Sequence, residues 1–593
     1  MSEHILVAIA WPYASAKIHV GNVTGSHLPG DIFARYHRMV GDHVLMVSGS
    51  DSHGTPITVR AEEEGKTPRE VFNRFHHEFL DLFQNLGISY DLFTHTDTEN
   101  HHRVSQDFFR ALLEADYLYK ETQQQMYSEV QGRFLPDRYV EGICPVCGYE
   151  SARGDQCDNC NALLDPAELI EPRSKLDGSE PTLRETEHYF LDLPQLAREG
   201  LAQWLALNKE HWRPSVINFA RNYVGEGLQG RPITRDLQWG VQVPLEGWED
   251  KCLYVWFEAV IGYFSASVEW AHNRGETEGW KDWWYDPGAK TLYFIGKDNI
   301  PFHAVIWPAE LMGVKRLYEE DSSQVLNLPY DVPANEFMNL EGRGMSGSRN
   351  WAVWADEAVE RFDPDAIRYY LTVAMPETRD TYWMWDNFVH RNNKELVGTW
   401  GNLAHRALTF AYKHFDGRVP TPGDLDELDK ALLEKVEDGF DRVGEQLAGC
   451  HFRAGLAEVM ELAREANRYL EEKGPWFQIK EDREAAGTTI YVVLRTIDAL
   501  KILFAPFLPF SSERLHRYLG YDDPIFGRQY TETFEEEGGR VHEALCYDGS
   551  EATGTWEPSA LPSGQALREP EPLFEALDED VIEEERARLG MET

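Results

Sequence analysis

The stretch Ile5–Asn22 constrains the fold of this chain more than any other. An apolar run of strand length, Ile5–Ala10, breaks into a loop of small residues that ends at His19-Val-Gly21-Asn. The segment that follows has helical character. A strand that delivers a histidine and a glycine to a helix N-terminus presents unpaired backbone N–H groups and partial positive charge, which suits a polyphosphate. Any core strand followed by a turn can produce the same pattern. The other segments of the chain are therefore needed to tell whether this turn binds a polyphosphate.

A second apolar run, His43–Ser48, supports an open parallel sheet. It ends in Gly-Ser-Asp51-Ser-His53. Ligands of such sheets bind beyond the carboxyl ends of the strands, so we expect Asp51 and His53 to face the same crevice as His19. Thr67–Glu70 then forms a capping box with proline at the first helical position. This alternation of strand and helix patterns predicts a doubly wound α/β domain.

The chain carries far more acid than base. Its 593 residues include 57 Lys and Arg against 101 Asp and Glu, a net charge of −44. Such a charge repels nucleic acid at low salt. One interpretation is a surface adapted to a salt-accumulating halophile, where molar salt shortens screening to ~3 Å. The other is a basic partner. The acidic residues are spread along the whole chain, which favours the first.

Length and hydropathy set further limits. A chain of 593 residues with 42% hydrophobic and 12% aromatic residues is expected to fold into several domains. Its N-terminus lacks a basic region followed by an apolar region, and no apolar run approaches the ~18 residues that span a bilayer. We therefore expect a cytoplasmic protein without membrane contact.

Four of the seven cysteines crowd into seventeen residues. Cys144-Pro-Val-Cys147 and Cys157-Asp-Asn-Cys160 form two knuckles, each able to clamp one tetrahedral metal from a tight turn. Because all four ligand positions are filled, we expect one structural Zn²⁺ in a reducing compartment. A bare ribbon of this type can also belong to a nucleic-acid-binding module, but here it lies inside a long insertion with few basic neighbours.

Two later segments carry aromatic and polar groups. Both Cys252–Tyr263 and Thr291–Trp307 open with strand-like residues. The groups that follow are Trp256, Glu258 and Tyr263 in the first and Lys297, Asp298 and His303 in the second. Converging with Trp11 and Tyr13, they would form a pocket for a long, flexible apolar side chain, and aromatic rings also attract thioether sulfur. The alternative is that these tryptophans are ordinary packing residues.

The remainder divides into a loop, a helical region and a tail. Leu340–Asn350 is a small-residue loop before an apolar segment, and Asp363 caps another helix. From about 386 to 515 periodic apolar residues predict a bundle of amphipathic helices. The last residues, rich in Pro, Gly and Glu, predict an extended tail whose final amphipathic segment docks on the body.

In this order the segments resemble the methionyl-tRNA synthetases, which are class I aminoacyl-tRNA synthetases, over essentially the whole chain. WPYASAKIHVGN is similar to the family's HIGH motif and GSDSHGTPI to its second motif. The knuckles occupy the connective insertion, and YVWFEAVIGY and FIGKDNIPFHAVIWPA look like methionine-pocket segments. Gly401–Arg406 and Pro475-Trp476 resemble anticodon-reading positions. The spacing looks most like the archaeal branch, which fits a halophile.

The resemblance implies an α/β fold: a class I Rossmann-like nucleotide-binding domain with a zinc-knuckle insertion, followed by an α-helical anticodon-binding bundle. It implies a two-step reaction, in which the carboxylate of L-methionine attacks the α-phosphate of ATP·Mg²⁺ and the terminal ribose of the cognate tRNA then takes the methionyl group. Catalysis would consist mostly of positioning and of stabilising charge on phosphate. DNA is not an expected partner.

The resemblance also assigns roles to residues. The ATP-binding set is His19, Gly21, Asn22, Lys297, Asp298, Met345, Ser346 and Ser348; the catalytic set is His19, Asn22, Arg343, Ser346 and Ser348. The methionine-binding set is Ala10, Trp11, Tyr13, Asp51, Arg235, Trp256, Tyr263 and His303, with Asp51 pairing with the substrate ammonium. Asn402, Arg406 and Trp476 would meet the anticodon by hydrogen bonding and stacking.

One motif departs from the family. Class I enzymes usually carry a KMSKS loop, whose lysines stabilise pyrophosphate in the transition state. This chain has Gly344-Met-Ser-Gly347-Ser, with both lysines replaced by glycine. Arg343 or Arg349 can supply the missing charge, since arginine binds phosphate in a bidentate manner. A second departure is Gly398, where the family often has an asparagine one turn before the anticodon-reading Asn402.

The alternatives are a catalytically weakened paralogue that binds tRNA or methionine, a class I enzyme for another amino acid, and a zinc-ribbon regulator. We expect a monomer without a C-terminal appendix. The expected regions are 1–120 and 231–330 for the two halves of the catalytic domain, 121–230 for the insertion, 331–385 for the stem-contact region with the KMSKS-like loop, 386–545 for the helical anticodon-binding domain and 546–593 for the tail.

Overall fold

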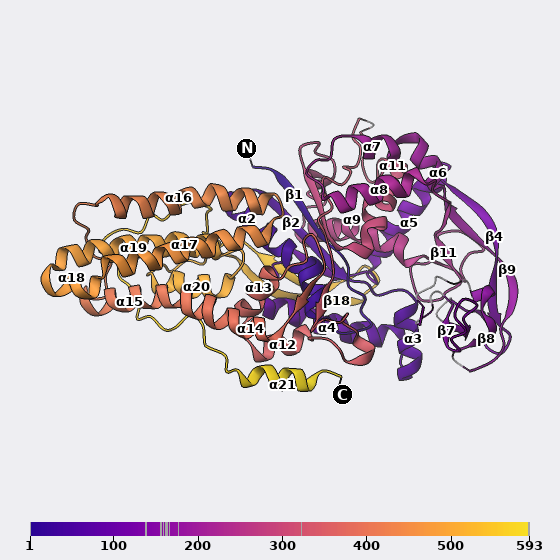
Figure 1. The fold of residues 1–593 in the computed structure, drawn as a ribbon. Helices are drawn as coiled ribbons and strands as arrows, with labels where there is room; N and C mark the ends of the chain where they lie inside the picture. The colour runs from indigo at the N-terminus through magenta and orange to yellow at the C-terminus, as the bar shows by residue number, and fades with distance from the viewer. Residues whose placement is uncertain are drawn as a thin grey trace.

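The computed structural model describes residues 2–590 except 137–138, 155–156, 158, 161–163, 165, 176 and 322. The largest sheet has seven strands in the order β14-β13-β1-β2-β3-β18-β17 (Figure 1). The strands from β14 to β3 are parallel, whereas β18 runs antiparallel to β3 and β17 antiparallel to β18. Their bounds are β1 (His4–Ile9), β2 (His43–Ser50), β3 (Leu92–His95), β13 (Lys290–Gly296), β14 (Ala334–Asn335), β17 (Arg528–Glu535) and β18 (Val541–Asp548).

Strand β1 is buried on both faces, because its side chains alternate between two hydrophobic cores. Within Ile5–Ile9, the odd-numbered residues pack in one core with α2 (Leu28–Val40) and α4 (Pro68–Leu86). The even-numbered residues pack in a second core with α5 (Glu99–Glu114) and α9 (Val255–Asn273). A strand covered on both faces needs apolar residues at every position. The predicted doubly wound α/β domain is confirmed.

One expected strand is a helix instead. Of Cys252–Tyr263, only Cys252–Leu253 forms a strand, β12, and the chain then enters α9 at Val255. This part of α9 is buried on nearly all sides. An apolar run without period cannot distinguish a buried helix from a buried strand. Trp256 and Tyr263 therefore reach the site from a helix and not from a strand end.

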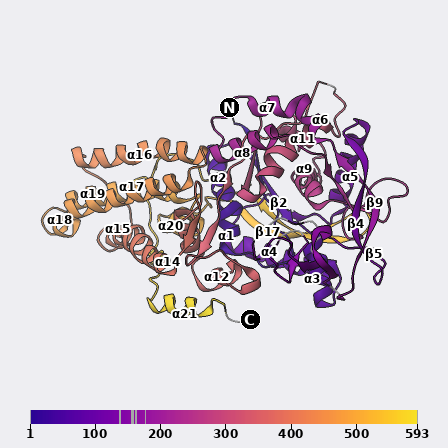
Figure 2. The same cartoon turned by 45° about the vertical axis from the view of Figure 1, so that its right-hand side comes forward.

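Besides the two-stranded sheet of β11 (Thr234–Arg235) and β12, the insertion between α5 and α9 builds two larger sheets. The first has four strands in the order β10-β9-β4-β5, formed by Arg231–Pro232, Thr182–Leu191, Leu118–Ser128 and Arg133–Phe134. The second has three strands in the order β7-β6-β8, formed by Ala152–Arg153, Val140–Ile143 and Ile170–Ser174, and it carries the cysteine knuckles. Both sheets lie at the opposite end of the molecule from the helical bundle (Figures 1 and 2).

The helical bundle projects from the α/β body as parallel rods (Figure 1). Its main helices are α15 (Asn402–His414), α16 (Glu427–Ala448), α17 (Phe452–Lys473), α19 (Arg483–Phe504) and α20 (Pro509–Tyr518). The outer helices have one apolar face in the common core and one polar face toward solvent, whereas α19 is buried on nearly all sides after its first turn.

Two strands fall wholly or partly in the range 386–545, for which the sequence predicts a helical domain. They are β17 and β18, a hairpin that extends the catalytic sheet at its β3 edge. Leu545 pairs with Phe93, so this pairing joins segments far apart in the chain. The hairpin thus belongs structurally to the α/β body. Local patterning did not reveal it because β17 is mostly polar on both faces, with Glu at several positions.

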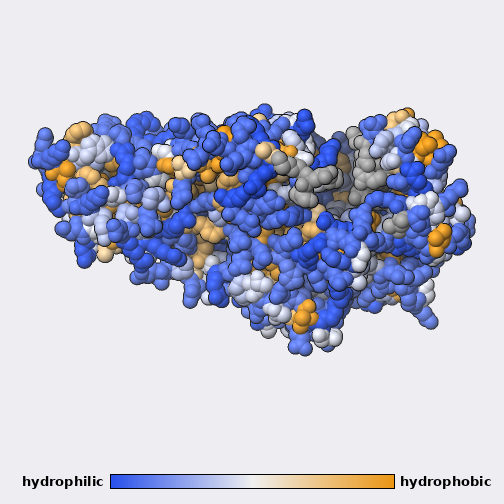
Figure 3. Space-filling model, turned by 90° about the horizontal axis from the view of Figure 1, so that it is seen from below, coloured by the Kyte–Doolittle hydropathy of each residue, from blue (hydrophilic) through white to orange (hydrophobic). Residues whose placement is uncertain are grey.

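The chain returns to the α/β body after the hairpin. Its last helix, α21 (Asp580–Arg588), lies below α12 (Ala355–Arg361) and α14 (Trp385–Arg391) in Figure 1. Seen from below, the molecular surface is mostly hydrophilic with scattered apolar residues (Figure 3). Among the described residues, no helix combines the length and apolar character needed to cross a membrane.

A buried arginine connects the bundle to the catalytic body. Arg368, on α13 (Pro364–Val373), has no solvent exposure and donates to Asp31 Oδ2 at 2.6 Å. It also donates to the carbonyls of Leu86 and Gly87 after α4, and of Pro506 and Phe507 between α19 and α20. Burial alone would raise the pKa of Asp31, but the neighbouring guanidinium groups of Arg35 and Arg368 outweigh it and lower the pKa to about 2.

We expect Arg368→Leu to destabilise the protein strongly. The change leaves buried carbonyls unpaired and removes one of the two cations that neutralise Asp31, and breaking a buried pair typically costs ~3–5 kcal/mol. The measurement is the free energy of the first unfolding transition in guanidinium chloride. Arg442→Leu is the control, because Arg442 pairs with Glu458 at the surface (2.8 Å); such pairs contribute ~0–1 kcal/mol. Equal losses in the two variants would contradict this role.

Candidate active site

The turn after β1 is closed by His19. The His19 backbone N–H donates to Asn22 Oδ1 (3.1 Å), and the Asn22 backbone N–H donates to His19 Nδ1 (3.3 Å). These two bonds cap the short helix α1 (Val20–Asn22), which continues into α2. Because Nδ1 accepts, the ring proton of the neutral imidazole is on Nε2. Burial lowers the pKa of His19 to about 4, so at pH 7 the ring is neutral and offers one N–H donor.

A cavity of about 380 Å³ brings together the two segments assigned to ATP. His19, Gly21 and Asn22 line one side, and Gly344 and Met345 line the other. The cavity is therefore shared by the β1 turn and the loop 341–350, which are more than 300 residues apart in the chain. This juxtaposition is what binding one polyphosphate between them requires.

The ends of β13 and β14 complete this cavity. Asp298 follows β13 and lines the cavity, and burial raises the pKa of its carboxyl group. Among the described residues, those that line this cavity do not include Lys297. Its ammonium instead pairs with Glu336 (2.8 Å) and Asp380 (2.7 Å). Glu336 itself lines the cavity, so Lys297 lies one contact away from it.

The indole of Trp11 fills the space between β2 and α9. A methyl group on Gly49 would come within 2.1 Å of this ring, and one on Gly262 within 2.7 Å. The two glycines thus permit the close approach of Trp11, which also lines the 380 Å³ cavity with Ala10. Its Nε1 has no hydrogen-bond partner among the described residues. These glycines were not predicted as site residues, although glycine within apolar strand or helix segments indicates such close approach.

A buried network of charges lies behind Trp11. Glu258 Oε1 contacts His53 Nδ1 at 2.7 Å, and Glu258 Oε2 contacts His101 Nε2 at 2.6 Å. Burial would lower the pKa of His53, but Glu258 and Asp97 raise it to about 10. The imidazolium and the carboxylate therefore stabilise each other. The sequence marks Glu258 only as a polar group in an aromatic segment, and gives no signal for its partners.

Asp51 differs from Glu258 in making no ion pair with another described side chain, although the nearby His53 imidazolium acts to lower its pKa. Its side chain is buried, and its Oδ1 accepts a long bond from the His53 backbone N–H (3.3 Å). Burial and the negative charge of Glu258 raise the pKa of Asp51 well above its ordinary value. A cation that enters here would favour the ionised carboxylate. Asp51 is thus a candidate for binding a positively charged group.

Tyr263 and His303 form a neutral pair. Tyr263 Oη lies 2.7 Å from His303 Nε2, and His303 Nδ1 lies 2.9 Å from the carbonyl of Asn299. The carbonyl can only accept, so Nδ1 carries the proton and Nε2 accepts from the tyrosine hydroxyl. Burial lowers the pKa of His303 to about 4, which keeps the ring uncharged. The Tyr263 ring lies 6.3 Å from that of Trp11.

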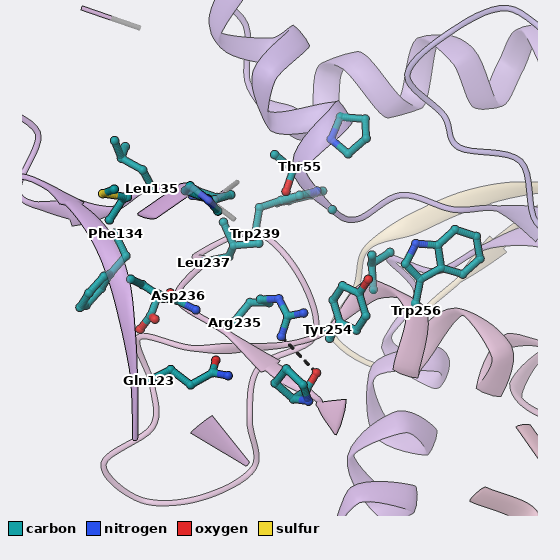
Figure 4. Close-up of a pocket in the computed structure, with 18 of the residues that line it drawn as sticks. Thr55, Gln123, Phe134, Leu135, Arg235, Asp236, Leu237, Trp239, Tyr254 and Trp256 are labelled. Carbon is teal, nitrogen blue, oxygen red and sulfur yellow. Dashed lines mark hydrogen bonds between the residues drawn. The ribbon is translucent and has the colours of Figure 1, made fainter. Parts of the chain in front are cut away.

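The other predicted methionine-binding residues line a second, larger cavity. This cavity of about 980 Å³ lies between the α/β body and the insertion, and Tyr13, Arg235 and Trp256 line it (Figure 4). Arg235 donates to the carbonyl of Pro232 (3.1 Å) and stacks over the ring of Tyr254. The predicted set thus divides between two cavities, with Asp51, Tyr263 and His303 buried behind Trp11.

The loop 341–350 reaches the 380 Å³ cavity through Gly344 and Met345. Arg343 is exposed, with its guanidinium 5.2 Å from the centre of the Trp351 ring, and is not among the described lining residues. Ser346 exchanges backbone hydrogen bonds with Trp351. Ser348 and Arg349 belong to a short 3₁₀ turn, but the Ser348 side chain lies outside the described part of the structure. The structure therefore brings the loop, but not the Arg343 charge, to the cavity.

The bundle carries the residues assigned to the anticodon. Arg406 and Trp476 line a cavity of about 400 Å³, and the guanidinium lies 4.7 Å from the centre of the indole ring. Asn402 is exposed at the start of α15, one turn beyond Gly398. Phe477 is also strongly exposed beside Trp476. An exposed aromatic next to an arginine is a suitable surface for stacking a nucleobase.

The four cysteines can hold one metal ion. Sγ of Cys144 lies 3.8 Å from that of Cys160, and Sγ of Cys147 lies 3.6 Å from that of Cys157. Thiolates at the corners of a tetrahedral Zn²⁺ site, each ~2.3 Å from the ion, are ~3.8 Å apart. The hydrogen bond from the Asn159 amide is the main cause that lowers the pKa of Cys147 to about 6, which favours the thiolate.

Two family models together match most of the chain. The model described as "tRNA synthetases class I (M)" matches residues 5–408. The model described as "Anticodon binding domain of methionyl tRNA ligase" matches residues 419–538. The first covers both segments that line the ATP-assigned cavity, and the second covers most of the bundle and β17.

Known proteins are similar over nearly their whole length. Methionine–tRNA ligase of Thermomicrobium roseum is 56% identical over 591 residues, covering 99% of this chain and 99% of that protein. The enzyme of the same name from Roseiflexus castenholzii is 54% identical, again with 99% of both chains covered. A structure of Mycobacterium tuberculosis methionyl-tRNA synthetase bound by methionyl-adenylate is 25% identical, with a TM-score of 0.75, and covers 97% of this chain and 100% of that one.

These relatives do not support the expected archaeal type or halophilic origin, because all three come from bacteria. Acidic composition describes how a surface is solvated and does not identify a lineage. Similarity over the whole chain is the better guide to lineage, since it draws on buried and functional positions as well as on the surface.

The charge network behind Trp11 predicts a pH effect. The pKa of His53 is raised above its unfolded value, so its contribution to stability is complete below pH 6.5 and is lost as pH rises through about 10. We expect Glu258→Gln to weaken this dependence, because the imidazolium loses its main partner. The measurement is the free energy of unfolding between pH 7 and 10. His542, whose pKa is also about 10, contributes equally to both proteins. An unchanged slope in the variant would contradict the assignment.

Proposed function

Starting from the fact that this chain belongs to the methionyl-tRNA synthetase family, we propose which residues act at each step of its reaction. The chain is a methionine–tRNA ligase: it joins L-methionine to the cognate tRNA through methionyl-adenylate, consumes ATP and releases AMP and pyrophosphate. The observation that carries the residue assignment is the single cavity formed by the β1 turn and the loop 341–350.

The β1 turn would bind the phosphates of ATP. The Nε2–H of the neutral His19 ring takes no part in the capping bonds. This group can therefore donate a hydrogen bond to a phosphate oxygen. Gly21 keeps the turn open, because a methyl group there would come within 3.0 Å of the His19 ring and 3.3 Å of the Met338 carbonyl. Mg²⁺ bound with ATP would neutralise part of the phosphate charge, and Asp298 and Glu336 are the acidic groups that line this cavity.

Asp51 would bind the methionine ammonium. Among the described residues its buried carboxylate makes no ion pair, and a charge-assisted hydrogen bond is worth most where the charges are desolvated. Trp11, Tyr263 and His303 would contact the thioether side chain, offering aromatic faces and a neutral hydrogen-bonded pair. Tyr13, Trp256 and Arg235 line the adjoining cavity, from which they would reach the substrate when it enters.

The glycine-substituted loop leaves the pyrophosphate charge to be stabilised by arginine. Arg343 is the first choice because it directly precedes Gly344, and its guanidinium stacks on Trp351 without an ion pair to another described residue. Rotation of this long side chain would bring a bidentate donor toward the cavity. No observation favours the weakened paralogue.

We expect Arg343→Ala to reduce methionine-dependent ATP–pyrophosphate exchange. Loss of a donor that stabilises transition-state charge lowers kcat by roughly 10²–10³, with little change in the KM for methionine. Arg349→Ala is the matched control in the same loop, and parallel reactions with leucine, isoleucine and valine test the substrate. Full activity of the Arg343 variant would exclude this arginine. Exchange that depends on another amino acid would exclude the proposed specificity.

The bundle would read the anticodon through Arg406, Trp476 and Asn402. We expect Trp476→Ala to lower aminoacylation by roughly 10-fold or more, because stacking of one base contributes ~1–3 kcal/mol. Pyrophosphate exchange should stay intact, since the adenylate cavity lies in the α/β body. Phe477→Ala is the neighbouring aromatic control. Loss of both activities in Trp476→Ala would contradict the assignment of anticodon reading to the bundle and of adenylate formation to the α/β body.

The cysteine cluster would hold one structural Zn²⁺, because its four thiol groups leave no position for a substrate. We expect one zinc ion per chain by elemental analysis, and its loss in Cys147→Ala; a chain that retains the full zinc content in this variant would contradict the assignment. The monomeric state, the cytoplasmic location and adaptation of the acidic surface to high salt stay predictions from the sequence.

A further inference from the structure

The C-terminal helix α21 and Gly590, two residues after it, contact the two ends of the loop 341–350. At the first end, Arg586 Nη2 donates to Glu341 Oε2 at 3.2 Å and to Asp386 Oδ2 at 2.7 Å. The Glu341 carboxylate also accepts from the Trp385 backbone N–H at 2.9 Å. At the second end, the backbone N–H of Gly590 donates to the carbonyl of Asn350 at 2.9 Å. The loop is thus bracketed by one short segment from the far end of the chain.

Both bracketed residues have an unusual backbone conformation. Glu341 and Asn350 each have φ of 46°, in the left-handed region. Asparagine tolerates this region, but glutamate rarely adopts it. Such conformations cost ~1–3 kcal/mol and persist only where surrounding contacts hold them. The Glu341 backbone N–H donates to the Trp383 carbonyl (3.0 Å), and Asn350 Oδ1 accepts from Trp354 Nε1 (3.0 Å). The contacts from Arg586, Trp385 and Gly590 add to these.

The loop 341–350 is rich in glycine, so contacts with other segments matter more for holding it in one conformation. Gly342, Gly344 and Gly347 all lie between the two ends. Glycine loses more conformational freedom on ordering than any other residue, so this loop is costly to hold in one place. Fixing its two ends reduces the number of conformations that the glycine segment can adopt.

The position of α21 does not depend on the loop. The Arg361 guanidinium of α12 donates to the buried carboxylate of Glu585 at 3.1 Å. Before the helix, the Leu577 backbone exchanges two hydrogen bonds of 2.8 Å with the Asn393 side chain. Apolar side chains of α21 also pack on the core that Met345 and Trp351 contact. The helix is therefore an independent support.

We propose that Arg586 and Gly590 are positioning residues that hold the loop 341–350 against the ATP cavity. The proposal rests on the proposed role of this loop in binding ATP. Gly344 and Met345 line the cavity, so displacement of the loop changes the wall that faces the phosphates. The bracket acts before ATP arrives, because its contacts involve only residues of the chain. It lowers the entropy cost of ordering the loop around the reacting phosphates.

The test combines loop mobility with kinetics in the full-length protein. Arg343 and Arg349 are trypsin sites within the loop, so the rate at which peptides ending at these residues appear reports its mobility. We expect Arg586→Ala to accelerate both cleavages, and to lower kcat/KM for ATP in pyrophosphate exchange by ~10-fold while the KM for methionine changes little. Arg586→Lys, which keeps the charge, should restore part of both losses.

Two controls separate the bracket from general destabilisation. Arg588→Ala removes an exposed arginine of the same helix that pairs with Glu585 at 3.8 Å, and it should leave both measurements unchanged. Gly590→Pro removes the backbone donor at the other end of the loop, whereas Gly590→Ala keeps it at the same positive φ. The proline variant should show the larger increase in cleavage, independently of the Arg586 variants.

The outcomes distinguish this inference from the proposed function. ATP should protect the wild-type loop from trypsin; absence of protection would contradict the proposed ATP role itself. If ATP protects but Arg586→Ala and Gly590→Pro leave cleavage and exchange unchanged, the bracket is wrong. Faster cleavage with unchanged kcat/KM for ATP would also overturn the positioning role, because the loop would then be mobile without consequence for the reaction.

Discussion

The buried guanidinium of Arg368 is the contact on which the arrangement of the parts depends. It is planar and has five donors, so it can satisfy carbonyls from two different connections and the carboxylate of Asp31 at once. Those partners belong to the α/β body on one side and to the turn between α19 and α20 on the other. A charge taken fully out of water is tolerated only with such complete pairing. The bundle therefore has one favoured orientation relative to the catalytic sheet, and the adenylate and anticodon ends of the molecule are connected through it.

The catalytic cavity shows a related use of burial. The polar groups in and behind it differ in charge: burial keeps His19, which lines the cavity, and His303, behind Trp11, neutral, whereas the Asp51 carboxyl group makes no ion pair among the described residues. Neutral donors can contact phosphate and thioether groups without binding a competing ion. The unmatched carboxyl group favours a ligand that brings its own positive charge.

Features that depend on residues close together in the chain could be predicted from the sequence, whereas contacts between distant residues could not. The β1 turn, the knuckles and the amphipathic helices follow from spacing of a few residues. The network around Glu258 could not be foreseen, because its partners His53 and His101 lie 205 and 157 residues away. The helix that begins at Val255 was hidden by its uniformly apolar sequence. The bracket on the 341–350 loop was equally invisible, since it joins the loop to the last described residues of the chain.

The hairpin of β17 and β18 has a consequence for how the protein is made. The N-terminal half of the sheet leaves the ribosome long before Leu545, which must pair with Phe93, has been synthesised. Until then β3 has an exposed edge, which is a template for pairing with other chains. Pairing across such a sequence separation is also slow, because the intervening chain has to close a large loop. Nascent chains therefore pass through a stage in which a nearly finished nucleotide-binding domain still needs protection, and chaperone dependence should concentrate there.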